Sequence, residues 1–154
     1  MRNTNSKAPH LLTGEHGEEI AADFVRKKGM KVLERNWRPA ASMTRGGASL
    51  ELDIVALDVD CIVFIEVKTR HVAPGAQFNP LEVFGLAKQK SLLRAATLYL
   101  ETRQAWSSPC RFDLICIIIS PGNSTGMEHY ENVLSFEHAG RGVVGGGNAP
   151  WQPW

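Results

Sequence analysis

Apolar residues recur at helical spacing in two segments of the chain, and shorter apolar or alternating runs lie between and after these segments. In the first segment Ile20, Ala21 and Phe24 fall on one helix face, behind a carboxylate-rich start that suits the helix dipole. Gly29 is a suitable C-terminal stop because glycine tolerates left-handed backbone. The predicted helices are about Glu15–Lys28 and Leu81–Arg103.

Two neighbouring runs predict the arms of a β-hairpin. Leu50–Leu57 alternates apolar and polar residues, whereas Cys61–Lys68 is β-branched and largely apolar. The second run is typical of a central strand that is covered on both faces. Three further runs predict strands: Met30–Trp37, Phe112–Ile119 and, as an edge strand, Glu128–Phe136.

The order of these elements predicts a single α/β domain. Helix, three strands, helix and strand, with one more strand after them, fit one mixed central sheet that is flanked by helices. We expect this domain to span residues 14–138. The polar, aperiodic segment 1–13 is predicted to be flexible, and so is the tail 139–154, whose glycine-rich sequence offers few apolar side chains to repay ordering.

Composition narrows the class of protein. The chain of 154 residues is 44% hydrophobic and 21% charged, which is typical of a globular protein with a real core. The net charge of +1 argues against a protein that coats nucleic acid, although it allows a local basic groove. The three cysteines form no close pair, so we expect reduced thiols and no zinc site. Neither a signal peptide nor a membrane-spanning run is found, and a cytoplasmic location is expected.

Three charged residues stand inside the predicted hairpin strands. Asp53 lies between Leu52 and Ile54, while Glu66 and Lys68 lie in an otherwise apolar run. Burying an isolated carboxylate costs several kcal/mol, so such a group needs a partner or a metal ion. The alternative is a structural network of ion pairs on a solvated face of the sheet.

The hairpin register brings these residues together. A turn centred on Val59-Asp60 places residue i opposite residue 119 − i, so that Asp53 faces Glu66 and Glu51 faces Lys68. Opposed carboxylates destabilise a sheet, and a hard divalent cation between them would turn the repulsion into coordination. Glu51 can also be a plain surface residue.

These residue types suit hydrolysis of a phosphodiester, which needs charge neutralisation, an activated water and a cation near the developing negative charge. Asp53 and Glu66 would hold Mg²⁺ or Mn²⁺ with the help of the Val67 carbonyl. Lys68 would orient the attacking water or steady the phosphate oxygens. Glu18 could add a carboxylate from the first helix, or could serve only the helix dipole.

An ordered set of motifs runs through the same region. The arrangement Asp53-x12-Glu66-Val67-Lys68 resembles the PD-(D/E)XK pattern of restriction-endonuclease-like and archaeal Holliday-junction-resolvase-like enzymes. The whole set resembles the YraN-like family of small bacterial proteins within that superfamily. The matching stretches are Gly14-x-x-Gly17-Glu18-x-x-Ala21, Asn36-Trp37-Arg38, Glu51-x-Asp53, Phe64-x-Glu66-Val67-Lys68-Thr69-Arg70, Lys88 with Ala95-Ala96 and Tyr99-Leu100, and Arg111-Phe112-Asp113. The chain departs from the family pattern at Leu50 and Val59, where the family usually has glycine.

This resemblance implies a restriction-endonuclease-like αβββαβ core and a metal-dependent endonuclease that hydrolyses DNA, with branched or structured DNA as one substrate class. It makes DNA the expected partner and leaves a homodimer open. Arg70 and Lys88 are candidate contacts to backbone phosphate, although both could simply be solvated. Arg111 and Asp113 could support the site or simply pair with neighbouring residues. The alternative function is a non-catalytic module that binds nucleic acid or another partner on the same scaffold.

Overall fold

The computed structural model describes residues 9–44, 49–73, 75–76, 79, 82, 84–122 and 125–136. The predicted tail 139–154 lies outside these residues, as does the first part of the N-terminal segment. The elements, in chain order, are α1 (Pro9–Lys27), β1 (Lys31–Trp37), the 3₁₀ turn η1 (Ala41–Met43), β2 (Leu52–Asp58), β3 (Cys61–His71), α2 (Leu86–Thr102), β4 (Cys110–Ile119) and β5 (Thr125–Leu134).

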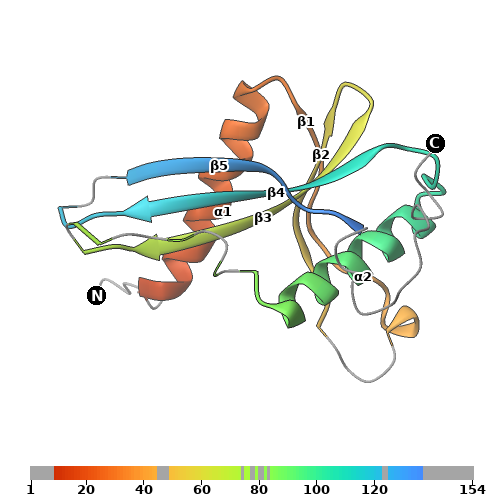
Figure 1. The fold of residues 1–154 in the computed structure, drawn as a ribbon, viewed down its shortest axis with the longest axis horizontal. Helices are drawn as coiled ribbons and strands as arrows, with labels where there is room; N and C mark the ends of the chain where they lie inside the picture. Colours follow the sequence, from red (N-terminus) through yellow and green to blue (C-terminus); the bar gives the residue numbers. More distant parts are fainter. Residues whose placement is uncertain are drawn as a thin grey trace, which may run out of the picture.

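The five strands form one mixed sheet in the order β1-β2-β3-β4-β5. Neighbouring strands are antiparallel except β3 and β4, which are parallel and are joined by the crossover through α2. The two helices lie against the sheet on opposite sides (Figure 1). This architecture confirms the predicted mixed α/β fold and is consistent with a restriction-endonuclease-like core.

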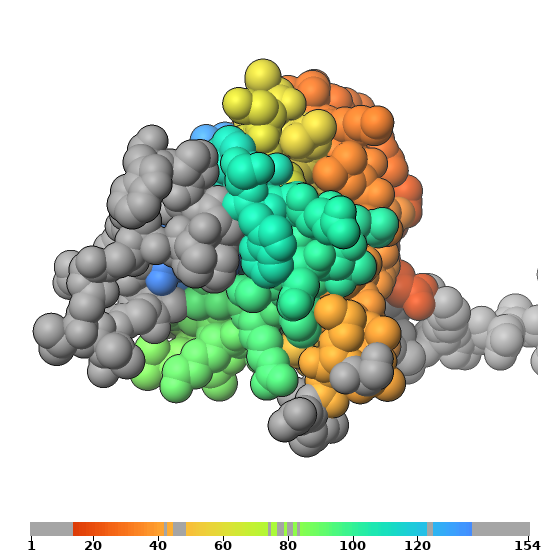
Figure 2. Space-filling model, turned by 90° about the vertical axis from the view of Figure 1, so that its right-hand side faces the viewer, coloured from red at the N-terminus to blue at the C-terminus, as the bar shows by residue number. Residues whose placement is uncertain are grey.

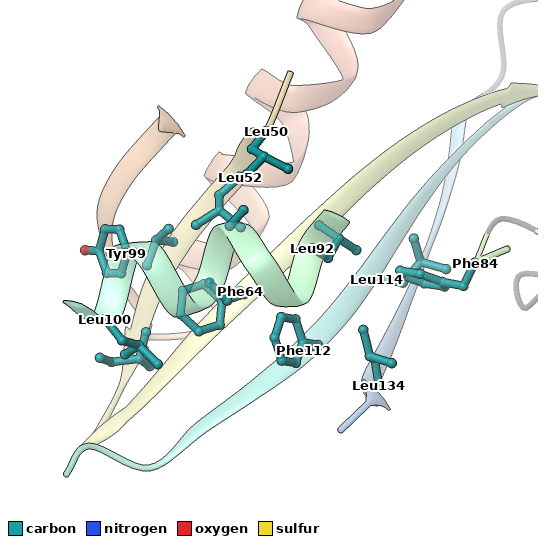
Figure 3. Close-up of a cluster of buried hydrophobic side chains, with 14 of the residues drawn as sticks. Leu50, Leu52, Phe64, Phe84, Leu92, Tyr99, Leu100, Phe112, Leu114 and Leu134 are labelled. Atoms are coloured by element: carbon teal, nitrogen blue, oxygen red, sulfur yellow. The ribbon is translucent and has the colours of Figure 1, made fainter. Parts of the chain in front are cut away.

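Alternation along the strands produces two apolar layers. Phe64, Phe112 and Leu114 point toward α2 and pack with Leu92 and Leu100 of that helix, as Figure 3 shows. The intervening strand residues point toward α1 and form the second layer, which contains Ala21, Val25, Ile54, Ile65 and Ile115. The central strand β3 is therefore apolar on both faces, as its sequence predicts. Figure 2 shows α2 at the surface of the molecule, below the turn between β2 and β3.

The hairpin has the predicted register. Its pairs run from Asp58 opposite Cys61 to Ile54 opposite Ile65, so each pair obeys the 119 − i rule. Val59, the first residue of the turn, has a φ of 56° and is almost fully exposed. A β-branched side chain rarely adopts positive φ, which is the conformation that glycine favours. The turn therefore keeps its geometry at the cost of local strain at Val59.

Both helices start at positions other than those predicted. α1 begins at Pro9 rather than near Glu15, so residues 9–13 are helical. Proline suits the first helical position because its missing N–H would have no partner there. α2 begins at Leu86 rather than Leu81, because Gly85 still has an extended ψ of 158°. None of the described helices is both long and apolar enough to cross a membrane.

Candidate active site

The site lies where β2 separates from β3. The last paired residues are Ile54 and Ile65, and at the next position the Asp53 carboxylate, Oδ2, accepts a hydrogen bond of 2.9 Å from the backbone N–H of Val67. Glu66 alternates with Phe64 and lies on the α2 side of the sheet. The hydrogen bond from the Val67 N–H to Asp53, and the contribution of the Glu66 charge to the raised pKa of Asp53, show that the two acidic groups lie close to each other.

Glu66 is the buried acid of this site, with only 3% of its surface exposed. Its Oε1 contacts the ammonium groups of Lys68 and Lys88, each at 2.9 Å. Lys68 follows on the same strand, whereas Lys88 reaches across from the first turn of α2. Within the described part of the chain, the second oxygen, Oε2, is buried and has no hydrogen-bond partner. An unpaired, buried carboxylate oxygen is costly unless a cation or a donor approaches it.

Glu18 comes to the same place from α1, on the opposite side of the sheet. With its amide nitrogen turned toward the acids, Asn36 donates to Glu18 Oε2 at 3.0 Å and to Glu51 Oε1 at 3.2 Å. Asn36 itself has a φ of 50°, a conformation that asparagine tolerates. Gly17, the residue before Glu18, lies so close to β3 that a Cβ there would overlap Thr69 Oγ1. The absence of a side chain at Gly17 therefore lets α1 approach the site.

The acids repel one another strongly. Burial first, and then the charge of Glu66, raise the pKa of Asp53 to about 7, although the hydrogen bond from the Val67 amide opposes this shift. Burial also raises the pKa of Glu18, with Glu51 and Glu66 adding to the effect and Asn36 and Arg35 opposing it. Asp53 therefore lies under the electrostatic influence of both Glu66 and Glu18, and an additional positive charge beside it would be favourable.

Three other residues that the sequence predicted, Val67, Arg70 and Glu51, lie at or near these acids. The carbonyl of Val67 points to the same side of β3 as its N–H, toward Asp53, because both groups of a strand residue face the same neighbour. Arg70 lies two residues beyond Lys68 on the same strand, is exposed and donates to the Thr69 carbonyl at 3.2 Å. Glu51 lies beyond the last β2–β3 pair and accepts a hydrogen bond from Arg38 at 3.0 Å. Of its two predicted roles, the surface residue fits this contact better than a partner of Lys68.

Arg111 and Asp113 belong to a second polar cluster, on the α1 side of the sheet. Arg111 Nε donates to both carboxylate oxygens of buried Asp113, at 3.1 and 3.2 Å. The backbone N–H of Asn132 and the ring of His129 also contact Asp113, each at 2.9 Å. Burial alone would raise the pKa of Asp113, but the bonds from His129, Arg111 and Asn132 outweigh burial and lower it. Of the two predicted roles of Arg111 and Asp113, pairing with neighbouring residues describes this arrangement.

Asp113, His129 and Glu131 could hold a metal ion, since each offers a ligand atom and these atoms lie within 4.8 Å of one another. The Lys28 ammonium group, however, is 2.9 Å from His129 Nδ1 and 3.5 Å from Glu131 Oε1. Because an ammonium group only donates, Nδ1 accepts and the proton of His129 lies on Nε2, toward Asp113. Lys28 therefore already contacts two of the three candidate ligands and would compete with a metal ion for them.

Sequence reasoning missed Asn36, His129 and Glu131. Asn36 stood in a recognised motif, yet its bond to Glu18 depends on a left-handed backbone that no spacing reveals. His129 and Asp113 lie on neighbouring strands, with no short spacing between them in the sequence. Trp37, the residue after Asn36 in that motif, packs edge-on against Tyr99 with the ring centres 5.2 Å apart.

The order of helices and strands is that of a mixed α/β protein and is consistent with a restriction-endonuclease-like core. Residues 17–117 match a family described as Uncharacterised protein family UPF0102. A UPF0102 protein of Lawsonia intracellularis is 38% identical over 141 residues, which cover 92% of this chain and 96% of that protein. One of Nitratidesulfovibrio vulgaris is 38% identical over 142 residues, covering 92% and 95%. One of Chlorobium phaeobacteroides is 43% identical over 110 residues, covering 71% and 79%. The chain belongs to the UPF0102, or YraN-like, family, and the predicted resemblance is confirmed.

Proposed function

We propose that this protein is a metal-dependent endonuclease that hydrolyses phosphodiester bonds in DNA. The observation that carries the proposal is the proximity of Asp53 and Glu66 where β2 separates from β3, with a buried oxygen of Glu66 left without a partner in the described structure and Lys68 beside it. Such an arrangement is unfavourable in a merely structural site, because like charges are held together at a cost.

The donor set fits a hard divalent cation. Asp53, Glu66 and Glu18 offer carboxylate oxygens, and Val67 offers a carbonyl oxygen directed to the same side as Asp53. Oxygen ligands suit Mg²⁺ or Mn²⁺, whereas a zinc site would call for histidine or cysteine. When bound, the cation would supply charge neutralisation and Lewis-acid polarisation of the phosphodiester.

Lys68 supplies the positive charge that the protein itself brings to the reaction. Its ammonium group is 2.9 Å from Glu66 Oε1 while its side chain keeps 28% exposure, so it lies at the boundary between the buried acid and solvent. At this boundary it can orient a water molecule for attack and stabilise charge on phosphate oxygens. Branched or structured DNA is the proposed substrate class, which rests on the resemblance of the motif order to resolvase-like nucleases.

Cleavage of a DNA panel by the purified full chain tests the proposal. Linear, flapped and four-way DNA would be incubated with Mg²⁺ or Mn²⁺ and with chelator. We expect metal-dependent cleavage that is reduced at least about 100-fold by Asp53→Asn and by Lys68→Met. Asp60→Asn, which changes an exposed acid in the turn of the same hairpin, should leave the rate unchanged.

Two results would count against the enzyme. If the wild-type chain binds DNA but cleaves none with either metal, the fold serves as a non-catalytic binding module. The near-neutral net charge would then restrict DNA binding to local contacts. If cleavage persists in both site variants, a contaminating nuclease produces it.

A further inference from the structure

We propose that Lys88 exchanges partners at the active site. It holds Glu66 while no divalent cation is present, and it contacts a phosphate group of the nucleic acid once a cation has replaced it at Glu66. This inference rests on the proposed function. It assigns to Lys88 of α2 the contact with the phosphate group next to the metal ion.

Glu66 has more cationic partners than it needs for neutralisation. Lys68 and Lys88 both contact the same oxygen, Oε1, at 2.9 Å, and Oε2 is left buried without a partner in the described structure. A divalent cation that binds Glu66 and Asp53 would come close to both ammonium groups. Like charges held this close repel one another, so at least one ammonium group has to leave.

Lys88 is the ammonium group that can leave. Lys68 lies two residues from Glu66 on the same strand face, so its backbone fixes it beside the acid. Lys88 comes from another element and reaches Glu66 only with its extended side chain, which is 36% exposed against 28% for Lys68. Its four-carbon stem can swing the charged end to solvent or to a ligand without movement of the backbone.

The place of Lys88 in α2 indicates the new partner. Lys88 is the third residue of the helix, where backbone N–H groups lack intrahelical acceptors and the dipole attracts negative charge. Gly85 at the N-cap gives no side-chain hydrogen bond to these amides, and the first turn contains no acidic residue. An ammonium group beside such a helix start suits a phosphate.

The formal charges at the site also favour a phosphate group as the new partner of Lys88. Glu18, Asp53 and Glu66 bring three carboxylates, and Lys68 and Lys88 bring two ammonium groups. A bound divalent cation therefore changes a formal excess of one negative charge into an excess of one positive charge. The site would repel phosphate before the cation binds and attract it afterwards, when Lys88 becomes available.

Lys88→Gln separates this role from a structural one. Removal of the competing ammonium group should tighten Mn²⁺ binding, measured by calorimetry, by about fivefold or more. The same variant should bind a four-way DNA about tenfold more weakly with Ca²⁺ in place of Mg²⁺, and the slope of log affinity against log salt should fall by about one. Lys90→Gln, two residues along the same helix and exposed, is the control and should change neither quantity.

The Mn²⁺ titration and the salt dependence of DNA binding each test one half of the proposed exchange of partners by Lys88. If Lys88→Gln leaves Mn²⁺ affinity unchanged or weakens it, Lys88 does not compete with the cation. If the salt slope is unaltered, Lys88 does not contact phosphate, and a lowered melting temperature alone would make it a structural ion pair. Failure of the wild-type chain to cleave DNA would refute the nuclease, whereas the Mn²⁺ and salt measurements would still decide the exchange.

Discussion

Val67 donates its backbone N–H to the carboxylate of Asp53, one position beyond the last pair of the β2–β3 ladder. The bond fixes Asp53 beside Glu66, and it also favours the charged form of a carboxylate that burial and Glu66 disfavour. The hairpin thereby holds two acids together although their repulsion destabilises the metal-free protein. Such stored repulsion is common where a protein prepares a site for a ligand.

Asp53→Asn should stabilise the metal-free protein at high pH. Because the pKa of Asp53 in the folded protein is raised from 3.8 to about 7, its favourable contribution is complete at acidic pH and is lost as the pH rises through 7. At pH 8 with chelator, we expect the variant to exceed the wild type by roughly 1–2 kcal/mol in unfolding free energy. Urea unfolding at several pH values measures the difference, which should vanish near pH 4.

If the wild type is instead more stable than Asp53→Asn at pH 8 without metal, Asp53 is not under repulsion in the folded protein. Addition of Mn²⁺ provides the internal control. It should raise the melting temperature of the wild type and leave that of the variant unchanged, since only a ligand bound to the native state adds stability.

Gly17→Ala should disturb the site through the position of α1. An alanine normally stabilises a helix relative to glycine, but here its Cβ would overlap Thr69 Oγ1. We expect a loss of about 1–3 kcal/mol in unfolding free energy together with weaker Mn²⁺ binding, because the shifted helix withdraws Glu18. Thermal melts and calorimetry would follow both.

A second substitution gives this prediction its control. Thr69→Ala in the Gly17→Ala background removes the overlapping oxygen, and the next contact, to Thr69 Cβ, is an ordinary 3.5 Å. Stability and Mn²⁺ affinity should both recover. If the double variant is as impaired as the single one, the close approach of α1 to β3 is not what positions Glu18.

Asp113→Asn should cost stability without removing metal binding at the proposed site. The substitution leaves Arg111 and His129 facing an amide in a buried place, and we expect a loss of about 3 kcal/mol. Glu131→Gln, on the exposed side of the same cluster, should cost less than about 1 kcal/mol. Chemical unfolding compares the two variants, and equal losses would mean that Asp113 is not the centre of this network.

The sequence predicted the hairpin and its register because both follow from local rules. A period of two in Leu50–Leu57 and a short turn at Val59-Asp60 determine the register, which the pairs from Asp58–Cys61 to Ile54–Ile65 follow. Asp53 lies beyond the last pair, where its bond to the Val67 N–H holds it near β3. The helix starts were less predictable. Pro9 begins α1 inside a segment without apolar periodicity, and α2 starts only after Gly85, whose backbone is still extended.

The contacts between elements that lie far apart in the sequence could not be predicted. Lys88 was a candidate for phosphate, but its ion pair with Glu66 depends on how α2 crosses the sheet. Likewise the network around Asp113 forms only when α1 and β5 bring Lys28 and His129 together. Spacing along the chain predicts which residues share a face of a strand, whereas contacts between helices and strands depend on packing.

Binding of Mn²⁺ to the full-length chain, titrated by calorimetry at pH 8, tests the central claim most directly. Two variants decide between the two acidic clusters: Glu66→Gln at the proposed site and Glu131→Gln at the cluster around Asp113. We predict that the wild type and Glu131→Gln bind the ion alike and that Glu66→Gln loses at least about tenfold in affinity. Unchanged binding in Glu66→Gln, with loss in Glu131→Gln, would place the metal in the other cluster and contradict the proposed active site.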